Sequence, residues 1–79
     1  LQEHWMMAYT ENVLGASLAA LGRFTEAEPL MLDGFETLET AAGVTAQHRS
    51  DCRERIAEMY DAWEKPDLAN KWRATSNGE

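Results

Sequence analysis

The chain has 79 residues, one cysteine and a formal net charge of −7, with 14 aspartates and glutamates against 7 lysines and arginines. This acidic balance argues against a nucleic-acid binder, which needs basic side chains against the phosphates, and no apolar run is long enough to span a membrane. A chain of this length is expected to be one small domain or a piece of a larger one. A single thiol, which cannot form an internal disulfide, is typical of a reducing, cytoplasmic compartment.

The first predicted helix extends from about Glu3 to Leu21 and is ended by Gly22. Five of its side chains recur at steps of three and four residues, which places them on one face and is typical of an amphipathic helix. They are Met7, Thr10, Leu14, Leu18 and Leu21.

The second predicted helix begins within the stretch LGRFTEAEPL, residues 21–30. Thr25 can cap the helix with its hydroxyl, and Glu28 three residues later completes a Thr-x-x-Glu capping box. Pro29 then falls in the first turn, where the N–H groups have no intrahelical partner. Gly43 is the predicted stop. The apolar stripe consists of Phe24, Ala27, Met31, Gly34, Phe35 and Leu38.

A third helix is predicted from about Thr45 to Glu64, and Pro66 fits the first position of a fourth. The stripe of the third helix consists of Cys52, Ile56, Met59, Tyr60 and Trp63, and that of the fourth of Leu68, Ala69 and Trp72. No segment alternates with the period of a strand, and the final TSNGE is expected to fray. The sequence therefore predicts an all-α fold of two antiparallel helical hairpins.

Residues 42 positions apart carry matching types of side chain, large with large and small with small, in one register. This pattern indicates that one helical hairpin is duplicated in the chain. The matched pairs are Leu14 with Ile56, Gly15 with Ala57, Leu18 with Tyr60, Phe24 with Pro66, Ala27 with Ala69, and Leu30 with Trp72.

The order Leu14-Gly15, Leu18, Gly22, Phe24 and Ala27 resembles the tetratricopeptide repeat (TPR) pattern. In such a hairpin, Gly15 and Ala27 are small where the two helices cross, Gly22 allows the turn, and Phe24 fills the base. The resemblance implies a fragment of a right-handed TPR-like superhelix. Its boundaries are about 6–40 for repeat one, about 46–75 for repeat two, and 75–79 for the tail.

The 42-residue period and the EAEPL form resemble the repeats of kinesin light chain more than the common 34-residue type. EAEPLMLDGFETL and RIAEMYDAWEKPDLANKWRA also resemble the C-terminal repeats of large bacterial multidomain serine/threonine kinases. Two positions depart from the family pattern: Glu11 replaces an aromatic residue and Glu64 replaces the second turn glycine. These departures imply an elbow of different shape at Glu64 and the C-terminal end of a repeat array.

Catalytic and metal-binding patterns are weak in this sequence. His48 and Cys52 would share a helical face, which leaves a metal or thiol site conceivable, but zinc needs about four ligands or three plus water. The glycine-rich loop and HRD motif of a kinase are absent from these residues. We expect no enzymatic activity, no cofactor and no metal. Trp63 and Trp72 are expected in the core, whereas Trp5 could pack on a neighbouring hairpin.

The family resemblance implies a concave binding face formed by the first helix of each hairpin. Repeat one would supply a small, apolar end and repeat two an acidic end with one arginine. The candidate residues are Tyr9, Asn12, Val13, Ala16 and Ala20 from repeat one, and Asp51, Glu54, Arg55, Glu58 and Asp61 from repeat two.

This face predicts a protein–protein interaction module for a protein or peptide partner that carries lysine or arginine and an apolar anchor. A terminal carboxylate is not expected as ligand, because the groove lacks lysines. The acids could instead only solvate the helix. A second hypothesis is structural: the open ends of the hairpins stack between chains and form a homo-oligomer, because two repeats are fewer than the three usually needed.

Overall fold

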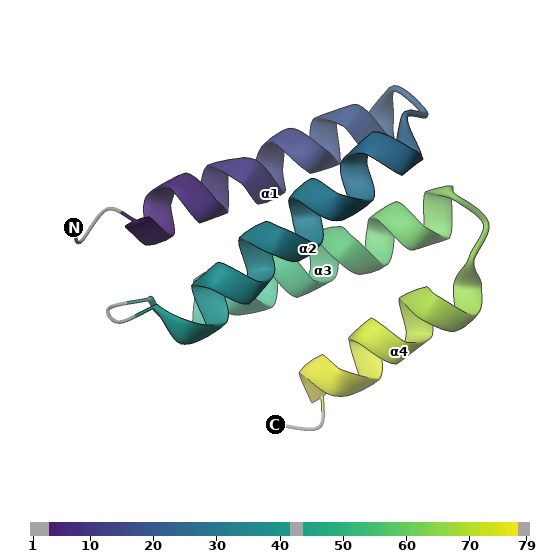
Figure 1. Ribbon diagram of the computed structural model, residues 1–79. Coiled ribbons are helices and arrows are strands. Elements are labelled where there is room, and N and C mark those ends of the chain that lie inside the picture. Colours follow the sequence, from purple (N-terminus) through teal and green to yellow (C-terminus); the bar gives the residue numbers. More distant parts are fainter. Residues whose placement is uncertain (1–3, 42–43, 78–79) are drawn as a thin grey trace.

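A computed structural model describes residues 4–41 and 44–77. Those residues fold into helices only, which confirms the predicted all-α class. The helices are α1 (His4–Ala20), α2 (Phe24–Thr40), α3 (Ala46–Ala62) and α4 (Pro66–Asn77) (Figure 1). Within the described ranges, no helix is both long enough and apolar enough to cross a membrane.

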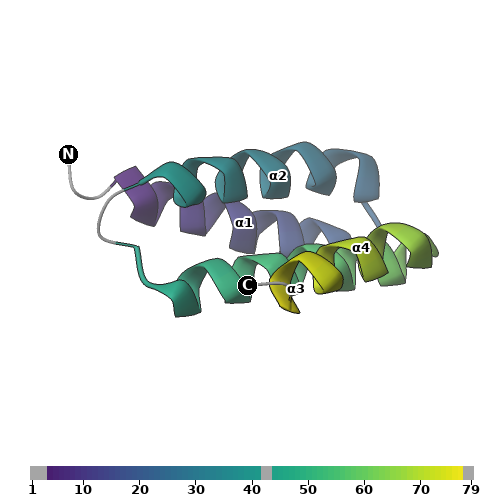
Figure 2. The ribbon, with the colours of Figure 1, turned by 90° about the horizontal axis from the view of Figure 1, so that it is seen from below.

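The helices form two antiparallel hairpins, α1 with α2 and α3 with α4, and α3 also contacts α1 and α2. α1 and α4 lie at opposite edges of the array (Figure 1). The turned view shows the helix axes lying roughly parallel or antiparallel to one another (Figure 2). The molecule measures 36 × 27 × 14 Å along its principal axes. Among the described residues, one side of α1 therefore has no helix packed against it.

The crossing of α1 and α2 depends on small residues. A Cβ atom at Gly15 would collide with the Met31 side chain and lie 3.1 Å from the Ala27 carbonyl oxygen. A Cβ atom at Gly34 would lie 2.5 Å from the carbonyl oxygen of Ala8. The predicted roles of Gly15 and Ala27 at a close crossing are therefore confirmed.

α1 buries a different face from the one that its large apolar residues mark. Met7, Leu14 and Leu21 are 69%, 51% and 72% exposed, and Leu18 is only partly buried. The face against α2 and α3 instead carries small and polar residues. The buried positions of α1 are Ala8, Asn12, Gly15 and Ala19.

The two elbows have the same backbone shape. Gly22 has φ 80° and Glu64, 42 positions later, has φ 64°. In the first elbow Arg23 N–H donates to the Leu18 carbonyl at 2.9 Å, and in the second Lys65 N–H donates to the Tyr60 carbonyl at 2.8 Å. The prediction of a differently shaped second elbow is therefore wrong: Glu64 adopts the left-handed conformation that glycine adopts in the first.

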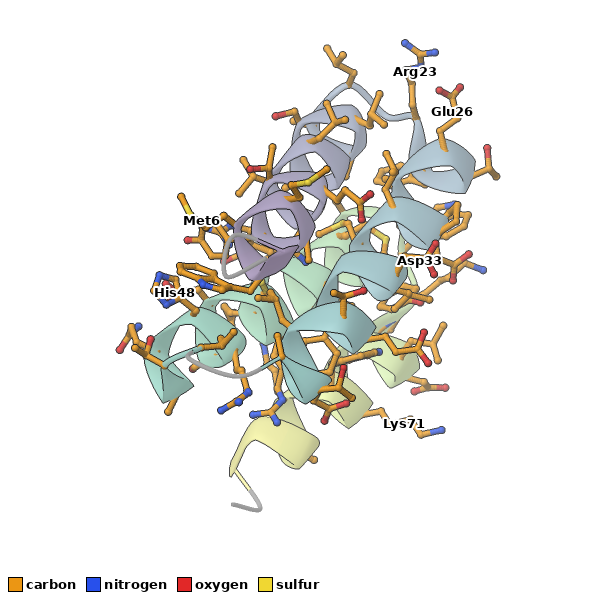
Figure 3. All side chains as sticks on the ribbon, turned by 60° about the vertical axis from the view of Figure 1, so that its left-hand side comes forward. Met6, Arg23, Glu26, Asp33, His48 and Lys71 are labelled. Atoms are coloured by element: carbon orange, nitrogen blue, oxygen red, sulfur yellow. The ribbon has the colours of Figure 1, made fainter. Side chains whose placement is uncertain are left out.

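The start of α2 also differs from the prediction. The helix begins at Phe24, so Thr25 lies inside its first turn and forms no capping box. Arg23 precedes the helix without a side-chain cap, and its guanidinium instead pairs with Glu26 at 2.8 Å (Figure 3). Glu28 accepts a hydrogen bond of 2.7 Å from the Tyr60 hydroxyl, which joins α2 to α3.

The remaining predicted boundaries agree with the structure in part. Thr45 caps α3 by accepting a hydrogen bond from the N–H of His48 at 3.2 Å, and α4 begins at Pro66 as predicted. The α4 backbone stays helical to Asn77, further than the predicted frayed tail allows. α2 ends at Thr40, and the predicted stop Gly43 lies outside the described residues.

Aromatic contacts join the two hairpins. Phe24 of the first elbow stacks on Trp63 of the second, with ring centroids 5.4 Å apart. Phe35 of α2 meets Trp72 of α4 edge to face at 5.2 Å. Beneath these rings, the core contains the fully buried side chains of Met31, Leu38, Ile56 and Cys52. Trp63 and Trp72 both pack against this core, as the sequence predicts.

Candidate binding face between α1 and α3

Arg55 of α3 is the polar centre of the face that α3 forms with α1. Its guanidinium donates to the Tyr9 hydroxyl at 3.0 Å and to the Asn12 Oδ1 at 3.4 Å, and its Cζ lies 4.9 Å from the centre of the Tyr9 ring. Burial is the largest single influence on the pKa of Arg55 and lowers it, but the hydrogen bond to the Tyr9 hydroxyl and the electrostatic attraction of neighbouring groups together outweigh burial, so the net pKa is raised. The face therefore holds a fixed cation.

Asn12 supports this cation from within the hairpin. Its side chain is completely buried. Oδ1 accepts from Arg55, but Nδ2 is buried with no hydrogen-bond partner in the structure. A buried N–H group without a partner costs roughly 1–3 kcal/mol. The Asn12 amide therefore has an unused donor beside the Arg55 cluster.

One end of the face is aromatic. His48 lies between Trp5 and Tyr9, with ring centroids 4.8 Å and 5.1 Å apart, and its Nδ1 is 2.7 Å from the Thr45 hydroxyl. Trp5 thus packs on the neighbouring hairpin, as the sequence indicates. These contacts fix the N-terminal parts of α1 and α3 against each other.

The other end of the face contains a small apolar cavity of about 180 Å³. Four alanines and a methionine form most of its wall, so the space exists because short side chains fail to fill the gap between the helices. Arg55 and Glu58 close its polar side. The lining residues are Ala16, Ala19, Ala20, Arg55, Glu58, Met59 and Ala62.

The structure separates the predicted binding residues into groups. Arg55 and Tyr9 form the polar centre, whereas Ala16, Ala20 and Glu58 line the cavity beside it. Asn12 lies beneath them. Val13 is on the exposed side of α1, 38% exposed, and is neither a hydrogen-bond partner of Arg55 nor part of the cavity lining.

Three of the four acids predicted for the binding face already interact with other side chains of this chain, Arg73 and Gln47. Glu54 and Asp61 bind Arg73 of α4, at 3.3 Å and 2.8 Å, and these contacts raise the pKa of Arg73, chiefly through Asp61. Asp51 accepts a hydrogen bond from Gln47 at 2.9 Å. Glu58 is therefore the candidate acid that borders the cavity.

Sequence reasoning missed several contributors to this face. Ala62 could have been found, because it lies 42 positions after Ala20 and repeats its residue type. Ala19 and Met59 carry no such signal. The position of His48 between two rings depends on how the hairpins pack, which no short pattern encodes.

The structure makes Cys52 a core residue. Its side chain is completely buried, and burial raises the pKa of the thiol to about 11, so little of it is in the reactive thiolate form at neutral pH. Among the described residues, no three His, Cys, Asp or Glu side chains lie close enough to hold a metal ion. The pairing of His48 with Cys52 thus gains no further ligand from the fold.

No family model, curated protein or solved structure matches this chain.

Proposed function

We propose that this chain is a non-catalytic protein–protein interaction module of the TPR type that binds a peptide or protein partner on the α1–α3 face. The observation that carries the proposal is the adjacency of the Arg55 cluster and the alanine-lined cavity of about 180 Å³. A cavity of this size accommodates one aliphatic side chain. A fixed polar group beside an apolar cavity is the arrangement that anchors a peptide side chain and orients its backbone.

The TPR assignment is supported by three features of the hairpins. Residue types recur at a 42-position offset, the two elbows share their hydrogen bonds and φ angles, and small residues lie at the α1–α2 crossing. On the sequence resemblance alone, we further propose that the chain is part of a larger bacterial regulatory protein that acts in the cytoplasm.

The charge of the molecule favours a basic partner. The net charge is −7, and Glu58 borders the cavity. A lysine or arginine next to an apolar anchor residue could pair with Glu58 while the anchor enters the cavity. Acidic surfaces also raise the association rate of basic partners at low salt.

The test is a binding assay with a library of basic peptides, each carrying one leucine anchor, read by fluorescence anisotropy. Ala20→Leu should fill the cavity and weaken the best peptide at least about tenfold, because one buried aliphatic side chain contributes about 1.5–3 kcal/mol. Ala74→Leu, at an exposed position on α4, is the matched control.

Glu58→Lys tests the charge, with Glu39→Lys on an exposed part of α2 as its control. Binding that weakens with Glu58→Lys and not with Glu39→Lys supports a local acid–base contact. Equal effects of both variants would leave only a long-range charge effect, and no effect of either would remove the basic partner from the proposal.

The alternative function is structural self-association through the open ends of the hairpins. The exposed apolar face of α1, with Met7, Leu14 and Leu21, favours it. Light scattering over a concentration series separates the two functions. A stable oligomer favours self-association, and a monomer favours the partner-binding module.

A further inference from the structure

Because the hairpin is duplicated, the contacts that cover α3 indicate what kind of helix would cover its counterpart, α1. In the second hairpin, α3 is covered by α2 through three side-chain contacts. Phe24 stacks on Trp63, Glu28 accepts from Tyr60, and the Arg53 guanidinium lies 5.3 Å from the centre of the Phe35 ring. Each contact pairs one residue of α2 with one residue of α3 or of the elbow that follows α3.

The residues at the same register in α1 and in the elbow after it form a face that none of the described helices covers. Subtraction of 42 places Leu21, Leu18, Leu14 and Glu11 where α3 has Trp63, Tyr60, Ile56 and Arg53. Ile56 is completely buried, whereas Leu14 is 51% exposed. We call these four residues, together with Met7, the outer face of α1. Figure 3 shows the neighbouring Met6 projecting from the same helix away from the molecule.

A second copy of this chain does not match the outer face of α1. By the same offset, α4 is the counterpart of α2, and a second copy stacked head to tail would present α4. However, Pro66 and Asn70 stand where α2 has Phe24 and Glu28, so this side of α4 lacks the aromatic and acidic side chains by which α2 covers α3. The two ends of the array are therefore not complementary.

The charge at Glu11 defines the partner further. Arg53 at the equivalent position is favourable over the Phe35 ring, because the face of an aromatic ring attracts a cation. The carboxylate of Glu11 would be repelled there. A helix that covers α1 therefore needs a base where α2 has Phe35. Opposite Leu18 it needs an apolar residue where α2 has Glu28, because Leu18 has no hydroxyl to bind an acid.

We propose that the outer face of α1 is a docking site for an amphipathic helix of a partner protein. This helix lies antiparallel to α1, as α2 lies to α3. It presents apolar residues over Leu21, Leu18 and Leu14 and a lysine or arginine opposite Glu11. The site differs from the α1–α3 face, so its failure would leave the proposed peptide binding untouched.

The test uses the internal offset to build the docked helix onto the full chain. His4 lies 42 positions before Ala46, so a copy of residues 4–45 inserted before His4 places a second α2 over α1 in the register that α2 has over α3. In the matched variant, the inserted copy carries Glu28→Leu and Phe35→Lys. In its control, the inserted copy carries Glu28→Leu and Phe35→Glu.

We expect the matched variant to unfold in one transition, with a Tm at least about 5 °C above that of the original chain. The Phe35→Glu control should have a smaller rise. Leu14→Ser in the original α1 should remove the rise from the matched variant while leaving the Tm of the original chain nearly unchanged, because Leu14 is exposed there. Two separate transitions, or equal Tm values for Lys and Glu at position 35, would overturn the proposal.

Light scattering on the original chain tests whether a second copy of the chain covers the outer face of α1. The outer face of one helix is small for a stable dimer, which buries at least about 1,200 Å² in total, so we expect a monomer. A dimer that Leu14→Ser dissociates would assign this face to a second copy and overturn the partner proposed here.

Discussion

The two hairpins share a backbone plan but bury different parts of it. The small residues of the repeat are buried in both: Gly15 and Ala57, and Ala27 and Ala69. The large residue beside the first pair is exposed in one hairpin, as Leu14, and completely buried in the other, as Ile56. Small residues therefore set the crossing within a hairpin, and large residues form the contact with the preceding helix.

The largest expected difference is between truncation of these two large residues. Ile56→Ala should lower the free energy of unfolding by about 2–5 kcal/mol, because it leaves a cavity between α2 and α3. Leu14→Ala should change it by less than about 0.5 kcal/mol, because the side chain is half in solvent. Urea unfolding followed by circular dichroism measures both, and equal losses would contradict the comparison.

The crossing residues give the next effect. Gly15→Ala should destabilise the chain by about 1–3 kcal/mol, because its new methyl group meets Met31 and the Ala27 carbonyl. The second hairpin already contains alanine at the equivalent position 57, so we expect the axes of its two helices to lie further apart where they cross. Met31→Ala in the Gly15→Ala background should recover part of the overpacking cost. A neutral Gly15→Ala would mean that the two crossings are equally wide.

Cys52 should make stability fall at alkaline pH, whereas its counterpart Thr10 is exposed. The pKa of the buried thiol is raised from 9.0 to about 11. Between these values the unfolded chain loses its proton and the folded chain keeps it, so rising pH favours unfolding. We expect a loss of about 1–2 kcal/mol from pH 9 to pH 11 beyond that of Cys52→Ala. Denaturant curves at both pH values measure it, and parallel losses in the two proteins would contradict the assignment.

The smallest expected effect is at the elbows. Glu64 has φ 64°, a conformation that is unfavourable for a residue with a side chain. Glu64→Gly should raise the free energy of unfolding by about 0.5–1 kcal/mol, the relief of strain being partly offset by the greater freedom of glycine in the unfolded chain. Gly22→Ala should lower it by a similar amount. Thermal unfolding measures both, and destabilisation by Glu64→Gly would mean that its carboxylate has a stabilising role.

The candidate site shows a similar division between local pattern and packing. The resemblance to a helical repeat family predicted Tyr9, Ala16, Ala20, Arg55 and Glu58 for one face, and the structure places them between α1 and α3. The binding of Glu54 and Asp61 to Arg73 was not predicted, because it depends on how closely α4 packs against α3. The capping box at Thr25 failed for a related reason: Glu28 instead binds Tyr60, a residue 32 positions away.

The sequence by itself determined the four helices, the proline at the start of α4 and the small residues where α1 and α2 cross, because local steric and hydrogen-bonding constraints act within a few residues. Tertiary structure decided which face of each helix is buried. The outer face of α1 is as apolar as the buried face of α3. The two faces differ because α2 packs against that face of α3 but contacts α1 on a different side. The same packing makes Glu64 adopt a glycine conformation and leaves a cavity between alanines that no local pattern specifies.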